Sequence, residues 1–238
     1  MPIIDCYTLI GSWPRTEVDL SLEALAAGMQ ARGVGRSLIT HTTGIFYSSS
    51  QGNDLAVALG QKHAQLVPVA VVNPLDYPQC LDEVSRRLAE GVKVFRLAPR
   101  EHGYPFSAAV GPLCDVLEKL SGAALILADL TGVREPVIDH ALVERLPVPT
   151  ALSVSGYELG TLLSAARKGP NVWLETSALT AGGAVEAAVR HLGADRIVFG
   201  SRAPLDTLGS AVMSLQYAEI ADGDRQAIFE GNAQRLLG

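Results

Sequence analysis

Short runs of apolar and β-branched residues alternate with longer amphipathic stretches from one end of the 238-residue chain to the other. The short runs predict buried strands, and the longer stretches, with an apolar residue every three or four positions, predict helices. Predicted strands cover 2–8, 35–41, 66–73, 91–97, 123–129, 148–154, 170–176 and 195–201. Predicted helices lie at about 21–32, 53–64, 78–90, 106–120, 134–145, 156–168, 180–192, 205–219 and 223–237.

Eight strands that are each followed by a helix are what a closed (β/α)8 barrel, the TIM-barrel form of the α/β class, requires. The length agrees, because such barrels run to about 250 residues as one domain. An open doubly wound sheet is the rival, but it usually has fewer strands and a glycine-rich phosphate loop after the first one. Here the first strand ends in TLIGSWP, which contains neither a GxGxxG nor a Walker pattern. We therefore expect a single (β/α)8 barrel domain over residues 1–238.

Composition argues against several classes of function. The formal net charge of −6 comes without a basic stripe, so we expect no nucleic-acid partner. No apolar run reaches the roughly 18 residues of a membrane helix, so we expect no membrane partner. The three cysteines show no paired spacing, and the first residues lack a basic region followed by a long apolar run. We expect a reducing, cytoplasmic location.

In a barrel of this kind the active site lies at the C-terminal ends of the strands. Because only side chains at or just beyond those ends can reach a substrate, the pattern of strands selects the candidates. They are Asp5, Tyr7, Leu9, Trp13, Arg15, His41, Tyr47, Asn73, Asp76, Arg96, Arg100, Glu101, His102, Tyr104, Asp129, Ser153, Ser155, Glu175, Ser177, Ser201, Arg202 and Asp206.

Five segments resemble landmarks of the amidohydrolase superfamily: IIDCYTLIG, GVKVFRLAP, NVWLETSAL, DRIVFGSRAP and IFEGNAQRLLG. They occur in the family's order over nearly the whole chain, and the nearest branch holds small-molecule decarboxylases, lactonases and related hydrolases. The last segment is the most diagnostic, because members of the family typically end in a helix that reads N-A-x-R-L-L. The resemblance implies the same barrel and a small-molecule substrate. Related barrels often dimerise, which leaves a homodimer open, although no residue pattern marks an interface.

The resemblance also implies a divalent metal, held by two histidines after the first strand, one histidine each on the fifth and sixth strands and an aspartate on the eighth. The corresponding positions here are Tyr7 and Leu9, then Ala128 or Asp129, Ser153 or Ser155, and Arg202. Zinc needs roughly three nitrogen, oxygen or sulfur ligands from the protein, and leucine offers none. The permanent charge of Arg202 would also repel the ion. We therefore expect neither a family-type metal centre nor another cofactor.

Two arginines are candidates for binding an anion. A guanidinium binds a carboxylate in bidentate fashion, so Arg202 could anchor an acidic substrate and Arg96 could complete the clamp. The alternative for Arg202 is an ion pair with Asp5, Asp129 or Glu175, and a structural salt bridge is the favoured reading of Arg96.

Three residues are candidates for moving protons. Asp129 ends an apolar strand, where burial would raise its pKa toward that of a useful general base, but capping the following turn is the favoured reading. His41 could shuttle protons, although a hydrogen-bonded histidine under loop 42–52 is the safer expectation. Asp5 serves either catalysis or a buried contact with Arg202 or a backbone amide.

The remaining candidates concern the shape of the pocket. Tyr7 should point inward and shape the pocket or offer a phenolic hydrogen bond. Glu175, at the end of the seventh strand, is a further candidate for binding the substrate. His102 and Tyr104 belong to a loop that either lines the pocket or only packs against the barrel. Cys6 has the opposite strand parity to Tyr7 and should face the helices.

Three hypotheses of function follow. The first and favoured one is a metal-independent hydrolase or lyase of amidohydrolase type, acting on a small anionic molecule, carboxylated or lactone-like, with Asp129 or His41 moving protons. The second is an inactive relative that binds a small molecule or a protein partner in the barrel mouth. The third is a metal hydrolase with relocated ligands drawn from Asp5, His41, Asp129 and Glu175.

Overall fold

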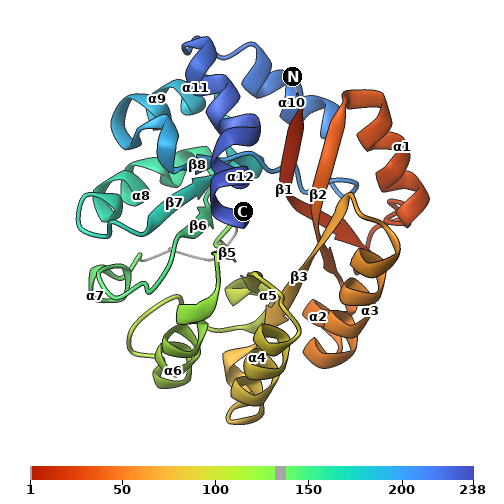
Figure 1. Ribbon diagram of the computed structural model, residues 1–238. Helices are drawn as coiled ribbons and strands as arrows, with labels where there is room; N and C mark the ends of the chain where they lie inside the picture. The colour runs from red at the N-terminus through yellow and green to blue at the C-terminus, as the bar shows by residue number, and fades with distance from the viewer. Residues whose placement is uncertain (1, 132–137) are drawn as a thin grey trace.

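Eight parallel strands form a barrel in the computed structural model, which describes residues 2–131 and 138–238 (Figure 1). The strands are β1 (Ile3–Ile10), β2 (Val34–His41), β3 (Leu66–Val72), β4 (Val94–Leu97), β5 (Leu125–Asp129), β6 (Thr150–Ser153), β7 (Val172–Glu175) and β8 (Ile197–Val198). Each pairs in parallel with the next. All eight strand predictions and the predicted barrel class are confirmed.

Backbone hydrogen bonds close the barrel between the segment after β8 and β1. The Cys6 N–H donates to the Phe199 carbonyl over 2.8 Å, and the Leu9 N–H donates to the Ala203 carbonyl over 2.8 Å. In the other direction the Arg202 N–H donates to the Tyr7 carbonyl over 2.8 Å. The segment that carries Arg202 is therefore fixed against the strand that carries Tyr7.

Helices surround the strands (Figure 1). The longer ones are α1 (Leu22–Arg32), α3 (Ser49–Lys62), α4 (Gln79–Ala89), α6 (Gly111–Lys119), α8 (Leu159–Ala166), α9 (Ala184–Leu192) and α10 (Leu208–Gln216). The Ser21 hydroxyl caps α1 by accepting from the Ala24 N–H over 3.1 Å, and Gly33 ends it in the left-handed conformation at φ 70°.

Some helix predictions need correction. Two short helices, α2 (Thr43–Phe46) and α5 (Pro99–His102), were not predicted because four residues are too few to show a helical period. Of the predicted helix 134–145 the structure gives α7 (His140–Val143), and residues 134–137 lie outside the described residues. The last predicted helix is divided into α11 (Asp222–Gln226), a π-helical turn at Ala227–Gly231 and α12 (Asn232–Leu237).

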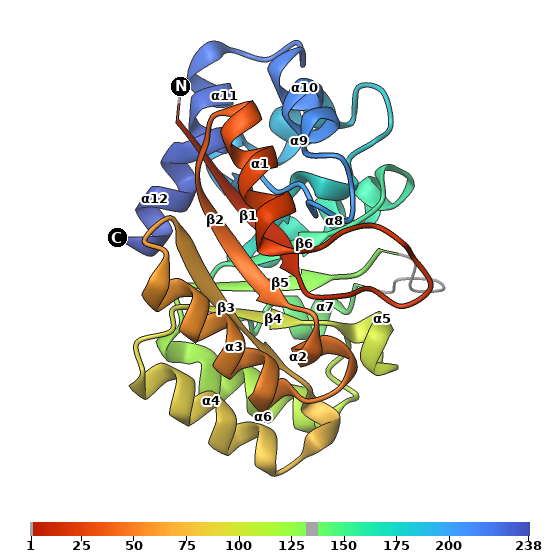
Figure 2. The ribbon, with the colours of Figure 1, turned by 90° about the vertical axis from the view of Figure 1, so that its right-hand side faces the viewer.

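The apolar core has two main layers. One lies between the strands and the surrounding helices. The other fills the barrel interior with Ile4, Cys6, Leu38, Val69, Val94, Leu125, Leu127, Ala151, Trp173 and Val198. Ala233 and Leu237 of α12 pack on this interior cluster, and Lys93 Nζ donates to the Leu237 carbonyl over 2.7 Å. Helix α12 therefore covers the N-terminal ends of the strands, on the opposite side of the barrel from α5 (Figure 2).

A β-bulge in β1 determines which side chains face the interior. Asp5 pairs with Ser37 and Thr8 pairs with Ile39, so three steps along β1 match two along β2. Cys6 packs in the interior cluster, and Tyr7, the next residue, packs with Leu9 nearer the mouth. The prediction that Cys6 faces the helices was wrong, because simple alternation does not hold across a bulge.

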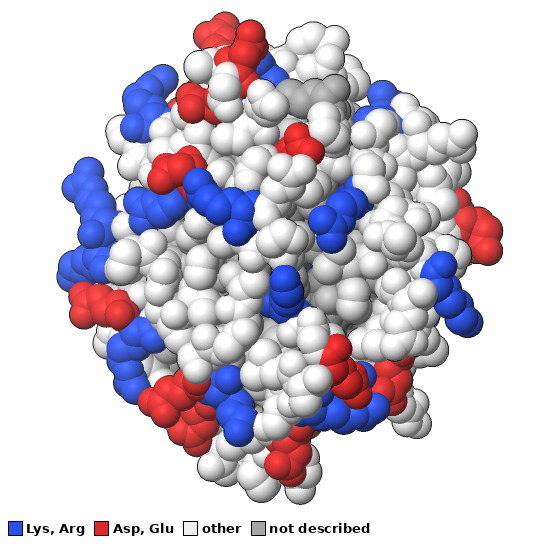
Figure 3. Space-filling view, viewed as in Figure 1, with Lys and Arg blue, Asp and Glu red and all other residues white. Residues whose placement is uncertain are grey.

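The surface shows no unusual charge distribution on the face that Figure 3 presents, where basic and acidic side chains are intermixed. Within residues 2–131 and 138–238, none of the helices is both long and apolar enough to span a membrane.

Asn232 ties α12 to the start of β8, and its loss should destabilise the protein. Its buried Nδ2 donates to the Ala194 carbonyl over 2.7 Å and to the Ile197 carbonyl over 2.6 Å. Asn232→Ala removes two buried hydrogen bonds and leaves a small cavity, which should lower the free energy of unfolding by about 2–4 kcal/mol in urea titration. Gln234→Ala, at an exposed position on the same helix, is the matched control and should change it by less than about 0.5 kcal/mol. Equal effects of the two substitutions would contradict this role of Asn232.

Candidate active site at the barrel mouth

The side chain of Tyr7 lies at the centre of the barrel mouth. Its hydroxyl donates to Asp129 Oδ2 over 2.6 Å. The Arg96 Cζ lies 3.6 Å from the ring centroid, and the Arg202 Cζ lies 5.9 Å from it. Burial raises the pKa of the Tyr7 phenol well above its ordinary value, and the charge of Asp129 raises it further. Tyr7 is therefore a neutral donor that brings residues of β1, β4, β5 and the segment after β8 together.

Arg96 is almost completely buried and only partly satisfied. Its Nε donates to Thr40 Oγ1 over 2.9 Å, while Nη1 and Nη2 have no hydrogen-bond partner among the described residues. The predicted salt bridge of Arg96 is not among the ion pairs of that part of the chain. The physical reason is that the nearby acids already accept other hydrogen bonds. Asp129 is bonded to Tyr7, and Glu175 is bonded to Ser153.

Arg202 is held in an unusual backbone conformation. Its φ of 58° lies in the left-handed region, which is uncommon for residues other than glycine and recurs at functional sites. Its Nη1 lies 3.2 Å from Asp206 Oδ2, and its buried Nε has no partner in the described chain. The predicted alternative partners Asp5, Asp129 and Glu175 are not ion-paired with it in this structure. Asp206 lies four residues further along the same segment and takes that place.

Asp129 accepts hydrogen bonds at both carboxylate oxygens. Besides Tyr7 at Oδ2, the Thr131 N–H and the Thr131 Oγ1 donate to Oδ1 over 2.9 and 2.5 Å. The contacts with Thr131 are those of a residue that caps a turn. Asp129 is thus both a turn residue and the acceptor of the phenolic proton.

Two further carboxylates, Asp5 and Glu175, are completely buried below Tyr7. Asp5 accepts from the Tyr7 and Ser201 N–H groups over 3.1 and 3.0 Å and from the Ser201 hydroxyl over 2.5 Å. Burial raises the pKa of Asp5 from 3.8 to about 7, and the charge of Glu175 adds to this. The backbone contact predicted as one role for Asp5 is therefore present.

Glu175 is surrounded by hydroxyl groups and a glycine. The Ser153 and Ser177 hydroxyls donate to its Oε2 over 2.5 and 2.6 Å, and burial raises its pKa. A Cβ added to Gly200 would lie 1.9 Å from Glu175 Oε1. Glycine at the end of β8 is thus what leaves room for the carboxylate.

His41, His102 and Tyr104 lie apart from this group. The Thr43 N–H donates to His41 Nδ1 over 3.3 Å, which is the hydrogen-bonded histidine expected under loop 42–52, and burial lowers its pKa. His102 Nε2 lies 3.1 Å from the Ile45 carbonyl, and the Tyr104 ring packs in the core between strands and helices. The structure brings together Tyr7, Arg96, Asp129, Arg202, Asp5 and Glu175, and not these three.

Two polar residues of the site were missed by sequence reasoning: Thr40 and Thr131. Thr40 has the same parity as the interior residue Leu38, so alternation along β2 could have identified it. Thr131 carries a hydroxyl group and follows Asp129 by two residues, a spacing that is common in turns. Glu101 was a candidate from the sequence, and burial raises its pKa, with a further contribution from the charge of Asp129.

Comparison with known proteins places the chain in a family. A family profile described as amidohydrolase matches residues 5–238. The chain belongs to the amidohydrolase family. No curated protein matches it.

Solved structures of other amidohydrolase-like barrels share its fold. One is 2,6-dihydroxybenzoate decarboxylase from Rhizobium, with a TM-score of 0.77, 14% identity, and coverage of 99% of this chain and 98% of that one. Another is 5-carboxyvanillate decarboxylase from Novosphingobium aromaticivorans with bound manganese, with a TM-score of 0.72, 13% identity, and coverage of 99% and 96%. A third is a Pseudomonas putida protein proposed to be a 2-pyrone-4,6-dicarboxylic acid hydrolase, with a TM-score of 0.68, 18% identity, and coverage of 99% and 97%. At these identities the likeness shows the shared barrel.

The metal that the resemblance implies does not fit the side chains at the mouth. Across residues 2–131 and 138–238, no three or more His, Cys, Asp or Glu side chains are grouped so that they could hold an ion. Tyr7 occupies one of the expected ligand positions and has the Arg96 guanidinium against its ring. A cation this close repels a divalent ion, because the buried surroundings screen it weakly.

The raised pKa of Asp5 makes a prediction about stability and pH. The unfolded chain releases the Asp5 proton near pH 3.8, whereas the folded chain holds it until about pH 7. Between these values the folded state binds the additional proton, so raising the pH favours unfolding and this contribution to stability falls, by a few kcal/mol in total. Asp5→Asn, which stays neutral, should flatten the decline in unfolding free energy between pH 4 and pH 7. Asp82→Asn, at an exposed position, is the control and should retain the wild-type slope. Parallel profiles for wild type and Asp5→Asn would contradict the assignment.

Proposed function

We propose that this member of the amidohydrolase family is a metal-independent hydrolase or lyase that acts on a small carboxylated molecule at the barrel mouth. One observation carries the proposal: Arg96 Nη1, Arg96 Nη2 and Arg202 Nε are buried without partners in the described chain, and both guanidiniums lie by the Tyr7 ring. A buried donor without a partner is costly and needs an explanation. An anionic substrate supplies one.

A carboxylate suits these donors better than other groups. The two terminal nitrogens of Arg96 form a fork that binds the two oxygens of a carboxylate, and Arg202 adds a second cation. The solved structures with the same fold include decarboxylases for carboxylated aromatic compounds and a proposed hydrolase for a pyrone dicarboxylic acid. These names support the substrate class without specifying the substrate.

Asp129 and Tyr7 are the groups that would move protons in this proposal. Tyr7 remains protonated because burial raises its pKa. Its hydroxyl can therefore donate a hydrogen bond to a substrate oxygen that gains negative charge during the reaction. Asp129 lies at the other end of the same hydrogen bond and can take up a proton from water or substrate. Arg202 would stabilise the developing charge.

A second candidate function is binding without turnover. Asp129 is the most suitable general base at the barrel mouth, but it already accepts three hydrogen bonds from Tyr7 and Thr131. This favours an inactive relative that retains a carboxylate-binding pocket.

Substitution of Arg96 tests the binding site that both functions require. Arg96→Met should weaken binding of 2,6-dihydroxybenzoate about 10- to 100-fold in isothermal titration calorimetry, because charge-assisted hydrogen bonds contribute about 1.5–3 kcal/mol. Arg96→Lys keeps the charge but loses the fork and should fall between wild type and Arg96→Met. Arg36→Met removes the same charge at an exposed position near the start of β2 and should bind like wild type. Unchanged binding in Arg96→Met would eliminate the proposed anion site.

Turnover distinguishes an enzyme from a binder. If the protein is an enzyme, Asp129→Asn should lower the rate of substrate loss about 100-fold or more, measured by chromatography of a bound carboxylate, while affinity changes less. If no rate is detected in wild type with any bound carboxylate, the second candidate replaces the first. Elemental analysis of chelator-free preparations should find zinc and manganese well below one ion per chain, and a stoichiometric ion needed for turnover would refute metal independence.

A further inference from the structure

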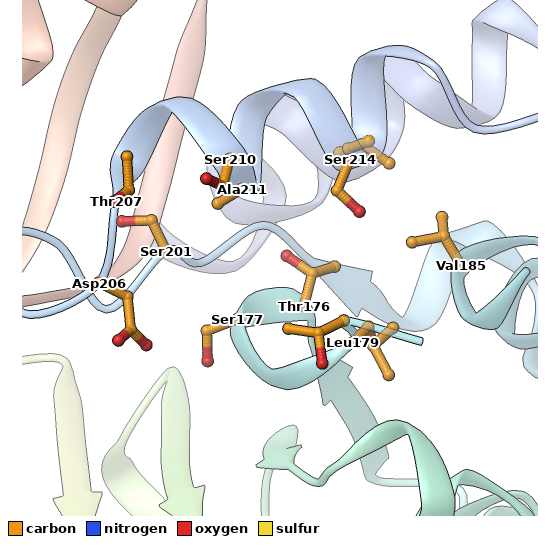
Figure 4. A pocket seen from close by; sticks show the side chains of 12 residues that line it. Thr176, Ser177, Leu179, Val185, Ser201, Asp206, Thr207, Ser210, Ala211 and Ser214 are labelled. Carbon is orange, nitrogen blue, oxygen red and sulfur yellow. The ribbon is translucent and has the colours of Figure 1, made fainter. Parts of the chain in front are cut away.

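A cavity of about 440 Å³ opens beside the barrel mouth, between the turn after β7 and helix α10 (Figure 4). This volume lies within the range of about 300–1,000 Å³ that is typical of small-molecule pockets. Ser210 and Ser214 line it from α10, and Thr176 and Leu179 lie on the opposite side. The proposed anion site uses none of these side chains, so the cavity is a distinct compartment.

Seven of the twelve residues that line the cavity carry a hydroxyl group, and the protein engages only some of these groups. Three are occupied: Thr176 bonds to the Gly200 backbone, Ser177 donates to Glu175, and Ser201 donates to Asp5. Four make no hydrogen bond with other described residues, and these are Thr180, Thr207, Ser210 and Ser214. Their hydroxyls can therefore donate to a ligand and accept from it.

The charges of the lining disfavour an anionic ligand. Asp206 is its one charged residue, and its carboxylate is 3.2 Å from Arg202 Nη1. No lysine or arginine lines the cavity, so an anion would have no counter-charge there. The apolar remainder is formed by Leu179, Val185, Ala211 and Leu215. Free hydroxyls beside an apolar wall suit a neutral ring with hydroxyl groups at its edge and C–H bonds on its face.

The ion pair of Arg202 and Asp206 connects this cavity to the barrel mouth. Asp206 lines the cavity, and Arg202 lies 5.9 Å from the Tyr7 ring. Ser201, the residue before Arg202, also lines the cavity and is bonded to Asp5 beneath Tyr7. Arg202 thus lies between the ring of Tyr7 and the lining of the cavity, in contact with both sides.

We infer that the cavity is a subsite for an uncharged, hydroxylated ring of the pyranose type, carried by the same substrate whose carboxylate binds at Arg96. This inference rests on the proposed function for the carboxylate and adds the class of the remaining part of the substrate. The substrate is then a glycoside or comparable polyol conjugate of a small carboxylic acid.

Two matched ligands test this subsite: 4-carboxyphenyl β-D-glucopyranoside, and 4-methoxybenzoate, which lacks the sugar. Wild-type protein should bind the glucoside about tenfold more tightly in isothermal titration calorimetry, because two or three hydrogen bonds contribute about that factor. Ala211→Phe fills the cavity and should reduce the ratio of the two dissociation constants to about one. Ser214→Ala removes one free hydroxyl with little risk to folding and should lower the ratio severalfold. Met213→Phe, at an exposed position on the same helix, should keep the tenfold ratio.

The outcomes separate the cavity from the anion site. Equal affinity for both ligands in wild type, with 4-methoxybenzoate still dependent on Arg96, would overturn the subsite and leave the proposed function intact. If 4-methoxybenzoate does not bind, the carboxylate proposal fails and methyl β-D-glucopyranoside reports on the cavity alone in ligand-observed NMR. A signal that Ala211→Phe abolishes would support the sugar site, and no signal would overturn it.

Discussion

The stacking of the Arg96 guanidinium on the ring of Tyr7 is the contact on which the barrel mouth depends. The ring must point inward for this contact, and the bulge in β1 provides that orientation. The hydroxyl of the same ring then reaches Asp129 on β5, so one aromatic side chain joins three strands. Because the arginine is held largely by the π-face of the ring and by a single threonine, its buried terminal nitrogens have no hydrogen-bond partner in the described chain.

Below this contact the ends of the strands are joined by buried acids and hydroxyl groups. Asp5 is bonded to Ser201, and Glu175 is bonded to Ser153 and Ser177. Each pair connects neighbouring positions of the barrel and satisfies carboxylate oxygens that water cannot reach. Hydrogen bonds within the protein thus satisfy the buried acids at these strand ends, while the arginines of the proposed anion site keep donors without partners in the described chain.

Much of the fold could be predicted from the sequence because it depends on local periodicity. Eight apolar runs and the intervening amphipathic stretches were sufficient for the barrel, and Asn232 lies in the closing segment that carried the family resemblance. The short helices were missed because they have no period to detect. The predicted orientation of the Cys6 side chain was wrong because of the bulge in β1. A bulge depends on how two strands pair, which the sequence of one strand does not reveal.

The candidate site could be predicted as a set of residues but not as a set of contacts. Tyr7, Arg96, Asp129 and Arg202 were identified, since the strand ends of a barrel converge. Which groups these side chains contact depends on their exact positions, and several acids lie close enough to compete for the same arginine. Arg202 pairs with nearby Asp206, and Arg96 binds a tyrosine ring instead of a carboxylate.

The position of Arg96 also limits how a metal ion could be held beside position 7. A histidine introduced at position 7 would stand beside a buried guanidinium whose charge has no ion-paired acid in the described chain. Histidines introduced one at a time would therefore each lie in a positive field that opposes the binding of a divalent ion. A metal ion at this position would require the arginine to be replaced as well, and that replacement would remove its stacking contact at the mouth. A family-type ligand set at this position therefore needs several coordinated substitutions.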